Sequence, residues 1–115
     1  ASVSRVDADG KVSTVWTGLT TITGLAVDAD GTLYAAQLAE TRKRAPFLQL
    51  GSGSIVRQTG AASAETVVDG LNLPTAIAFG PDGALYVASP AFGANDGGGS
   101  VARVVPGDEP QTLNT

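Results

Sequence analysis

The sequence predicts an all-β protein whose strands come in hairpins, and three observations support this. Runs of alternating small and large or polar and apolar residues, typical of half-buried strands, fill most of the 115 residues. Turns rich in Asp, Gly and Pro separate the runs, as expected where hairpins close. The same runs recur at a fixed interval along the chain, which indicates a repeat architecture without any helical period.

The most regular hairpin covers residues 76–88. Residues 76–79 alternate in size, Gly80-Pro81-Asp82-Gly83 supplies turn chemistry, and residues 84–88 alternate again. A copy lies 52 positions earlier, at residues 24–36. The identical pairs are Ala26/Ala78, Asp30/Asp82, Gly31/Gly83, Leu33/Leu85, Tyr34/Tyr86 and Ala36/Ala88. Because these are turn and packing positions, we expect the hairpin to build sheets rather than to bind a ligand.

A second hairpin type begins the chain and follows each copy of the first. Most of its members keep the same spacing of 52 positions, and the last comes sooner because the loop before it is shorter. Residues 37–53 and 90–99 lack alternation and are expected to be irregular loops. The strands of this second type are predicted at residues 2–6 and 11–16, 54–58 and 65–71, and 100–104 and 111–113.

The order of these strands predicts an all-β, partial β-propeller. Four consecutive antiparallel strands in each unit of about 40 to 50 residues match the blades of a propeller. The chain would supply about two and a half four-stranded antiparallel blades. The half blade is expected at residues 1–19, one blade at 20–71 and the other at 72–115. An immunoglobulin-like sandwich is the main competing fold, but its strands do not normally repeat at a fixed interval.

Two stretches resemble a known group of proteins. Residues 74–88, PTAIAFGPDGALYVA, are followed by GSVARV at residues 99–104. They are similar to the NHL and gluconolactonase-like six-bladed propellers, and most similar to the bacterial secreted ScyD/ScyE family. The resemblance implies an exported protein, extracellular or periplasmic, without a well-defined activity. Two positions depart from the pattern, because Ala76 replaces the usual Gly and Asp28-Ala29 stands where the second copy has Gly80-Pro81.

Composition narrows the function classes. The net charge of −4 and pI near 4.4 give no electrostatic reason to bind nucleic acid. No run is long and apolar enough to span a bilayer, so direct membrane insertion is not expected. The chain has no His and no Cys, which removes the commonest general base and any thiol nucleophile. We therefore lean against an enzyme and expect no catalytic residues and no cofactor.

Charged residues recur in two patterns. The acidic turns at residues 7–10 and 28–31 begin like a calcium loop but lack its later ligands, so hairpin closure explains them better than metal binding. Arg5, Arg57 and Arg103 occupy matching positions in the repeat. We expect them to be solvated or to pair between blades with carboxylates such as Asp69.

The loops, which differ between the copies, are the predicted recognition surface. In a propeller the two long loops emerge on one face, together with residues 71–73. A solvated loop without a binding role is the competing interpretation. The candidate partner-binding residues on this loop face are Arg42, Lys43, Arg44, Phe47, Phe92, Asn95 and Asp96.

Two functions from different classes remain open. The first is a non-catalytic exported propeller segment that serves as a binding or scaffolding module. Its partners would be the remaining blades of the same propeller or other protein subunits, and assembly of several copies is an alternative. The second is a fragment of a propeller hydrolase, lactonase or lyase whose catalytic residues lie in other blades.

Overall fold

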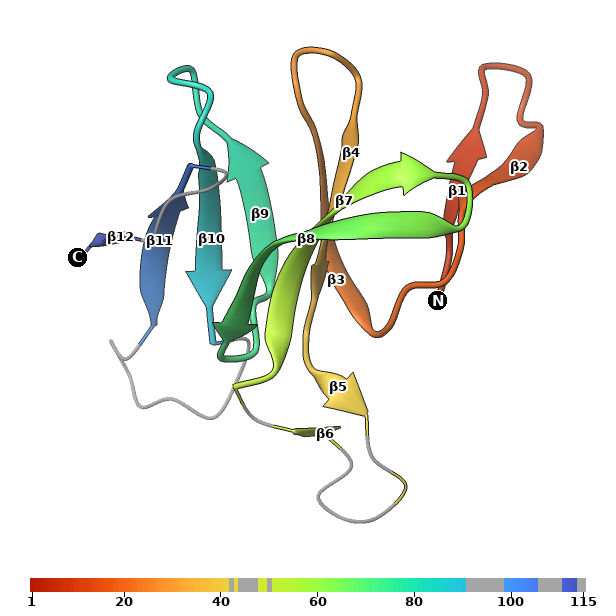
Figure 1. Cartoon of the computed structure of the whole chain (residues 1–115). Coiled ribbons are helices and arrows are strands. Elements are labelled where there is room, and N and C mark those ends of the chain that lie inside the picture. The colour runs from red at the N-terminus through yellow and green to blue at the C-terminus, as the bar shows by residue number, and fades with distance from the viewer. Residues whose placement is uncertain (42, 44–47, 50, 91–98, 106–110, 114–115) are drawn as a thin grey trace.

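The computed structural model describes residues 1–41, 43, 48–49, 51–90, 99–105 and 111–113, and all the regular structure in these ranges is β-strand (Figure 1). The described residues therefore contain no helix that could cross a bilayer. The prediction of an all-β, antiparallel fold is confirmed. Within the described residues the sheets do not close into a ring.

Two four-stranded antiparallel sheets form the body of the molecule, each with its strands in chain order apart from one small insertion. The central sheet contains β3 (Ile22–Val27), β4 (Leu33–Gln37), β7 (Gly53–Gly60) and β8 (Ser63–Leu71). The second sheet contains β9 (Ala76–Phe79), β10 (Leu85–Ser89), β11 (Ser100–Val104) and β12 (Gln111–Leu113). The first strands of the two sheets, β3 and β9, lie side by side.

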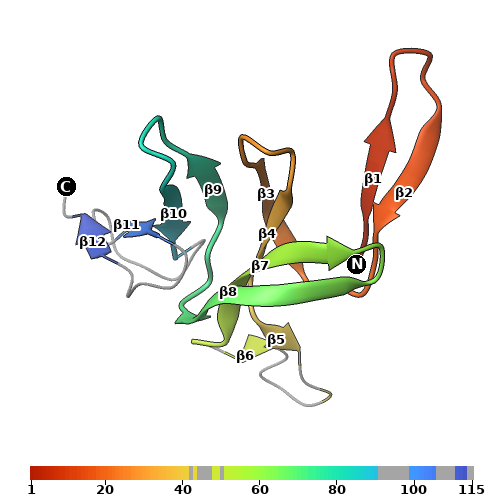
Figure 2. The ribbon, with the colours of Figure 1, turned by 45° about the horizontal axis from the view of Figure 1, so that its top comes forward.

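A separate hairpin stands on the other side of the central sheet. It consists of β1 (Val3–Val6) and β2 (Val12–Trp16), and its tip points away from the body (Figure 2). The Oδ1 atom of Asp7 accepts hydrogen bonds from the amides of Asp9 and Lys11, at 3.0 and 2.9 Å. Asp28 bonds its own turn in the same way, through the amides of Asp30 and Thr32. The acidic turns thus close hairpins, as predicted.

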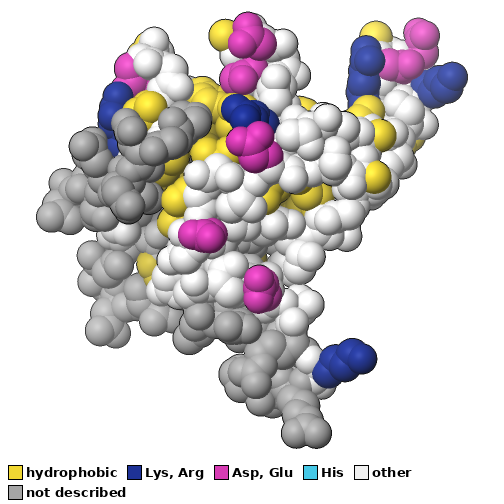
Figure 3. Space-filling model, in the orientation of Figure 1, with side chains coloured by type: hydrophobic (Ala, Val, Ile, Leu, Met, Phe, Trp, Pro, Cys, Tyr) yellow, Lys and Arg dark blue, Asp and Glu magenta, His cyan; other side chains and the backbone are white. Residues whose placement is uncertain are grey.

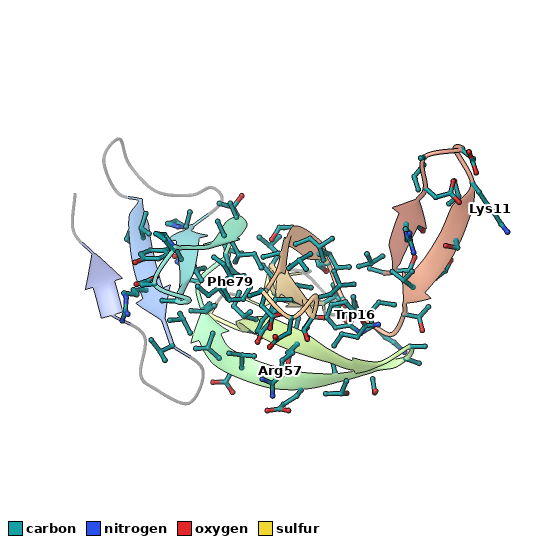
Figure 4. All side chains as sticks on the ribbon, turned by 90° about the horizontal axis from the view of Figure 1, so that it is seen from above. Lys11, Trp16, Arg57 and Phe79 are labelled. Carbon is teal, nitrogen blue, oxygen red and sulfur yellow. The ribbon has the colours of Figure 1, made fainter. Side chains whose placement is uncertain are left out.

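Side-chain alternation along β4 gives the central sheet a core on each face. Tyr34 and Ala36 point toward the second sheet, where they pack with Ile77, Leu85 and other buried residues. Ala35 points the opposite way and packs with Trp16. Figure 4 shows Phe79 and Trp16 on the two sides of β3 and β4. The Tyr34 and Phe79 rings meet edge to face, with centroids 4.9 Å apart.

The structure differs from the prediction in two places. The segment at residues 37–53, expected to be an irregular loop, contains a small sheet of β5 (Glu40–Thr41) and β6 (Leu48–Gln49). The β7–β8 hairpin is also longer than its sequence pattern indicated. Its end reaches the β1–β2 hairpin, where the Thr17 amide donates to the Ala61 carbonyl at 2.9 Å.

Candidate functional site

A polar cavity of about 270 Å³ lies at the end of the central sheet from which the β4–β7 connection emerges. Residues from β4, β5, β7, β8 and the segment before β3 contribute to it. Figure 1 shows that β5 and β6 lie at this end, opposite the tips of the β1–β2, β3–β4 and β9–β10 hairpins. The cavity is lined by Thr20, Gln37, Ala39, Glu40, Ser52, Ser54, Thr66 and Asp69.

Hydrogen bonds fix the inner wall of this cavity. Gln37, the last residue of β4, accepts a bond from the Thr20 amide at 2.7 Å. Its Nε2 atom donates to the Ser54 hydroxyl at 3.0 Å, across the β4–β7 pairing. Ser52 accepts a bond from the Glu40 amide at 2.7 Å. Main-chain and side-chain partners therefore hold the Gln37 amide and the Ser52 and Ser54 hydroxyls in place before any ligand arrives.

The described residues that line the cavity carry negative charge. Glu40 and Asp69 bring two exposed carboxylates to the lining, and none of the other described lining residues is charged. Every other lining side chain except Ala39 ends in a hydroxyl or an amide. Such a surface can accept hydrogen bonds from hydroxyl or ammonium groups and repels anions.

The corresponding end of the second sheet is built differently. Ser89 and Ser100 pair across β10 and β11, as Gln37 and Ser54 pair across β4 and β7. A cavity of about 300 Å³ lies there too, and the described residues that line it, among them Ala88, Pro90 and Val101, include no charged side chain. The polar, acidic lining is therefore a property of the central sheet. In the sequence, this difference between the two cavities is visible at one pair of equivalent positions, where Gln37 in the first copy corresponds to Ser89, 52 positions later.

Most of the predicted loop-face residues lie outside the described part of the chain. Of the seven, only Lys43 is described, and it is exposed. Arg42, Arg44, Phe47, Phe92, Asn95 and Asp96 fall in ranges that the structure does not describe. Leu73, expected on the same surface, is instead buried against Leu38 and Ala39. Its role is packing between the β4–β5 and β8–β9 connections.

Two of the three recurring arginines, Arg57 and Arg103, pair within their own sheets rather than between blades, whereas Arg5 is exposed and forms no ion pair with a described residue. Arg57 on β7 meets Glu65 on β8 at 2.8 Å. Arg103 on β11 meets Asp82, in the β9–β10 turn, at 3.1 Å. Asp69 takes part in neither pair and lines the polar cavity instead. Arg57 and Arg103 therefore link neighbouring strands and turns within their own sheets.

The pKa values of these groups follow from their hydrogen bonds. The Ala84 amide, the Arg103 side chain and the Tyr86 hydroxyl bond the Asp82 carboxylate, and together they lower the pKa of Asp82. Hydrogen bonds to Glu65 and Tyr34 raise the pKa of Arg57 further above its usual range. Both groups therefore stay charged at neutral pH.

The described ranges contain no group of three or more Asp and Glu residues close enough to hold a metal ion. Trp16, the one Trp of the chain, is fully buried and donates its indole N–H to the Ser63 carbonyl at 3.1 Å. It is therefore a core residue and offers no stacking platform to a sugar.

Comparison with known proteins assigns no relative. No protein-family model matches the chain, and no curated protein matches it.

Proposed function

We propose that this chain is a non-catalytic binding module, built as part of a β-propeller and exported from a bacterial cell. The support for the architecture is the order of strands in the two four-stranded sheets and the position of β3 beside β9. Short antiparallel sheets placed side by side through their first strands are what a propeller requires. The support for export is the resemblance of residues 74–88 to the secreted ScyD/ScyE family.

The observation that favours binding is the polar cavity at the β4–β7 end of the central sheet. Hydrogen bonds hold its Gln37 amide and its Ser52 and Ser54 hydroxyls in place, and two exposed carboxylates belong to its lining. Pre-positioned polar groups lower the entropic cost of recognition. The ligand class that fits is polar and carries hydroxyl or positively charged groups, with no negative charge.

An NMR titration tests this proposal. The probes are neutral saccharides, primary amines and carboxylic acids, added separately to 15N-labelled protein. We expect neutral or amine probes to shift the side-chain amide signals of Gln37 and the backbone signals around Ser54. Carboxylic acids should leave these signals unchanged, because Glu40 and Asp69 repel them.

Two variants and a control locate the binding. Asp69→Asn should weaken amine binding by about threefold to tenfold, which corresponds to roughly 0.7 to 1.4 kcal/mol of a charge-assisted contact at an exposed site. Gln37→Ala should weaken the binding of saccharides and amines alike. Asp9→Asn, which removes an exposed carboxylate from the opposite end of the molecule, should change nothing. Preferential binding of acids, or equal binding by all the variants, would refute the proposal.

A further inference from the structure

The face of the central sheet that looks toward the β1–β2 hairpin is only partly covered. Leu25 and Val27 on β3 are 45% and 53% exposed. They pair across the strands with Ala35 and Leu33, which belong to the core around Trp16. The hairpin thus covers the part of this face near Trp16, where Ile22 packs, and leaves Leu25 and Val27 largely exposed.

The equivalent surface of the second sheet, on β9, is covered. Ile77 and Phe79 lie 52 positions after Leu25 and Val27. Ile77 is only 9% exposed, and the Phe79 ring meets the Tyr34 ring edge to face. The cover is the β3–β4 hairpin of the central sheet, which contributes Tyr34, Ala36 and Ala26 to that core. The surface that is bare on β3 is therefore covered on β9 by a hairpin with small and aromatic side chains.

The β1 strand has a free edge beside this bare surface. Among the described strands β1 pairs with β2 alone, whereas the corresponding strands β7 and β11 each pair on both edges. The strands that fill the inner edge of β7 and β11 are β4 and β10, the second strands of the first hairpin type. Figures 1 and 2 both place β1, rather than β2, on the side of β3 and β4.

The hydrogen-bonding groups on this edge can be named. In the β1–β2 hairpin the Asp7 amide donates to the Lys11 carbonyl, so the Asp7 main chain points toward β2. Main-chain groups alternate in direction along a strand. The amides and carbonyls of Ser4 and Val6 therefore point away from β2, toward the free edge.

We propose that the β1 edge and the exposed β3 side chains together form a docking site for a β-hairpin of the same type as residues 22–37, supplied by another polypeptide segment. Its second strand would pair with β1, and its inward side chains would cover Leu25 and Val27. A second copy of this chain is not the expected donor. Its own two hairpins are already held on both sides, because β4 pairs with β3 and β7, and β10 pairs with β9 and β11.

A synthetic peptide supplies the probe. A peptide corresponding to residues 20–38 is added to the full chain, and amide hydrogen exchange is followed by NMR. We expect exchange at Ser4 and Val6 to slow by at least about tenfold, since a protected ladder must open before exchange. The methyl signals of Leu25 and Val27 should shift at the same peptide concentrations. A peptide with the same residues in scrambled order should have neither effect.

Matched substitutions locate the site. Leu25→Asp places a charge in the proposed contact and should abolish peptide binding, while its exposed position spares the fold. Val12→Asp places the same charge at a side chain that is 64% exposed on β2, outside the proposed contact, and should leave binding unchanged. A circular dichroism spectrum like that of the unsubstituted chain establishes that each variant folds.

Three results would overturn the inference. The first is unchanged exchange at Ser4 and Val6 with saturating peptide. The second is equal slowing by the scrambled peptide. The third is concentration-dependent protection of these amides without peptide, accompanied by a dimer mass, which would make a second copy the occupant. This docking site rests on the proposed repeat of hairpins, but the experiment measures only amide exchange on β1 and the methyl signals of Leu25 and Val27. Failure of the polar cavity to bind a ligand would leave this test unaffected.

Discussion

Asp82 joins a turn, a strand and an ion pair through one carboxylate. Its Oδ1 atom accepts a hydrogen bond from the Ala84 amide at 3.1 Å, and its Oδ2 atom accepts bonds from Tyr86 and Arg103. Tyr86 on β10 and Arg103 on β11 face each other across the strands. The carboxylate therefore ties the β9–β10 turn to the next strand in the sheet, which is a reason for Asp at this position beyond turn chemistry.

Substitution of Asp82 should make stability less dependent on pH. Because these bonds lower the pKa of Asp82 in the folded state, the unfolded state binds a proton more readily, near pH 4. The stabilisation is present above that pH and is lost as the pH falls through the lower folded pKa. Urea unfolding at pH 7, 4 and 2 should show Asp82→Asn less stable than the parent at pH 7, with the difference shrinking toward pH 2.

Asp30 is the matched control for this experiment. It lies 52 positions before Asp82, but its carboxylate forms no ion pair among the described residues. Asp30→Asn should change the unfolding free energy by less than about 0.5 kcal/mol at pH 7, as is usual for an exposed site. If the two substitutions gave the same pH profile, the Arg103 pair would not be the cause.

Backbone strain marks another pair of residues that the sequence did not reveal. Thr21 and Leu73, again 52 positions apart, have positive φ angles of 47° and 52°. A β-branched or bulky residue rarely adopts this conformation. Each residue lies in the connection that leads into the first strand of a four-stranded sheet. The repeat makes the two positions equivalent, but because Gly is the usual residue at positive φ, Thr and Leu gave no sign of the conformation that the backbone shows at both.

At the scale of elements, hairpins were predictable and their ends were not. Alternation and turn residues located five of the six strand pairs among the described residues, because a strand with one buried face has a two-residue period in its sequence. The two-residue strands β5 and β6 are too short to show any period, so their segment was predicted to be irregular. The extension of β7 to Gly60 depends on contacts with residues 15–17, which no local pattern encodes.

The polar cavity was only partly predictable for a related reason. The sequence predicted a recognition surface at the connections that differ between the copies, and the cavity lies at one of these connections. Thr20, Thr66 and Asp69 reach it from strands and connections distant in the chain, through sheet geometry alone. Asp69 was one possible partner for the recurring arginines in the sequence analysis, because sequence alone does not give the register that places Arg57 opposite Glu65.

Gly53, the first residue of β7, allows three segments to meet closely. A Cβ atom there would lie 2.8 Å from the Leu38 carbonyl and 2.9 Å from the Leu71 carbonyl, and it would overlap Pro74. Backbone atoms and a proline ring cannot move aside easily. We therefore expect Gly53→Ala to lower the unfolding free energy by about 1 to 3 kcal/mol, the usual cost of overpacking.

The comparison substitution for this glycine is Gly99→Ala. Among the described residues, a Cβ atom at Gly99 would meet only the Ser89 carbonyl, at 3.9 Å, which is an ordinary contact. Urea unfolding of the two variants should differ by at least about 1 kcal/mol, with Gly99→Ala near the parent. Equal stability of the two variants would mean that the connections around Leu38, Leu71 and Pro74 can separate at little cost.

At the scale of the whole molecule, stability is divided between two interfaces. The core around Trp16 joins the β1–β2 hairpin to the central sheet, and the core around Tyr34 and Leu85 joins the two four-stranded sheets. The central sheet separates these cores, as Figure 4 shows for Trp16 and Phe79. In Figure 3 charged side chains lie at the hairpin tips and on the surface of the body, and none of these described side chains belongs to the buried core, so they add little to either interface. Where units contact only their neighbours, each interface contributes its own term to stability.

Removal of Trp16 should therefore release one hairpin rather than unfold the chain. Trp16 is fully buried and bonds Ser63, so Trp16→Ala should weaken the first interface by about 3 to 5 kcal/mol. Hydrogen exchange should then show lost protection in Val3–Val6 and Val12–Trp16, with protection retained in Leu85–Ser89. Val104→Ala, at a fully buried site in the other core, should reverse the pattern and loosen Ser100–Val104 first. Uniform loss of protection in both variants would indicate one cooperative unit, in which the hairpin and both sheets unfold together.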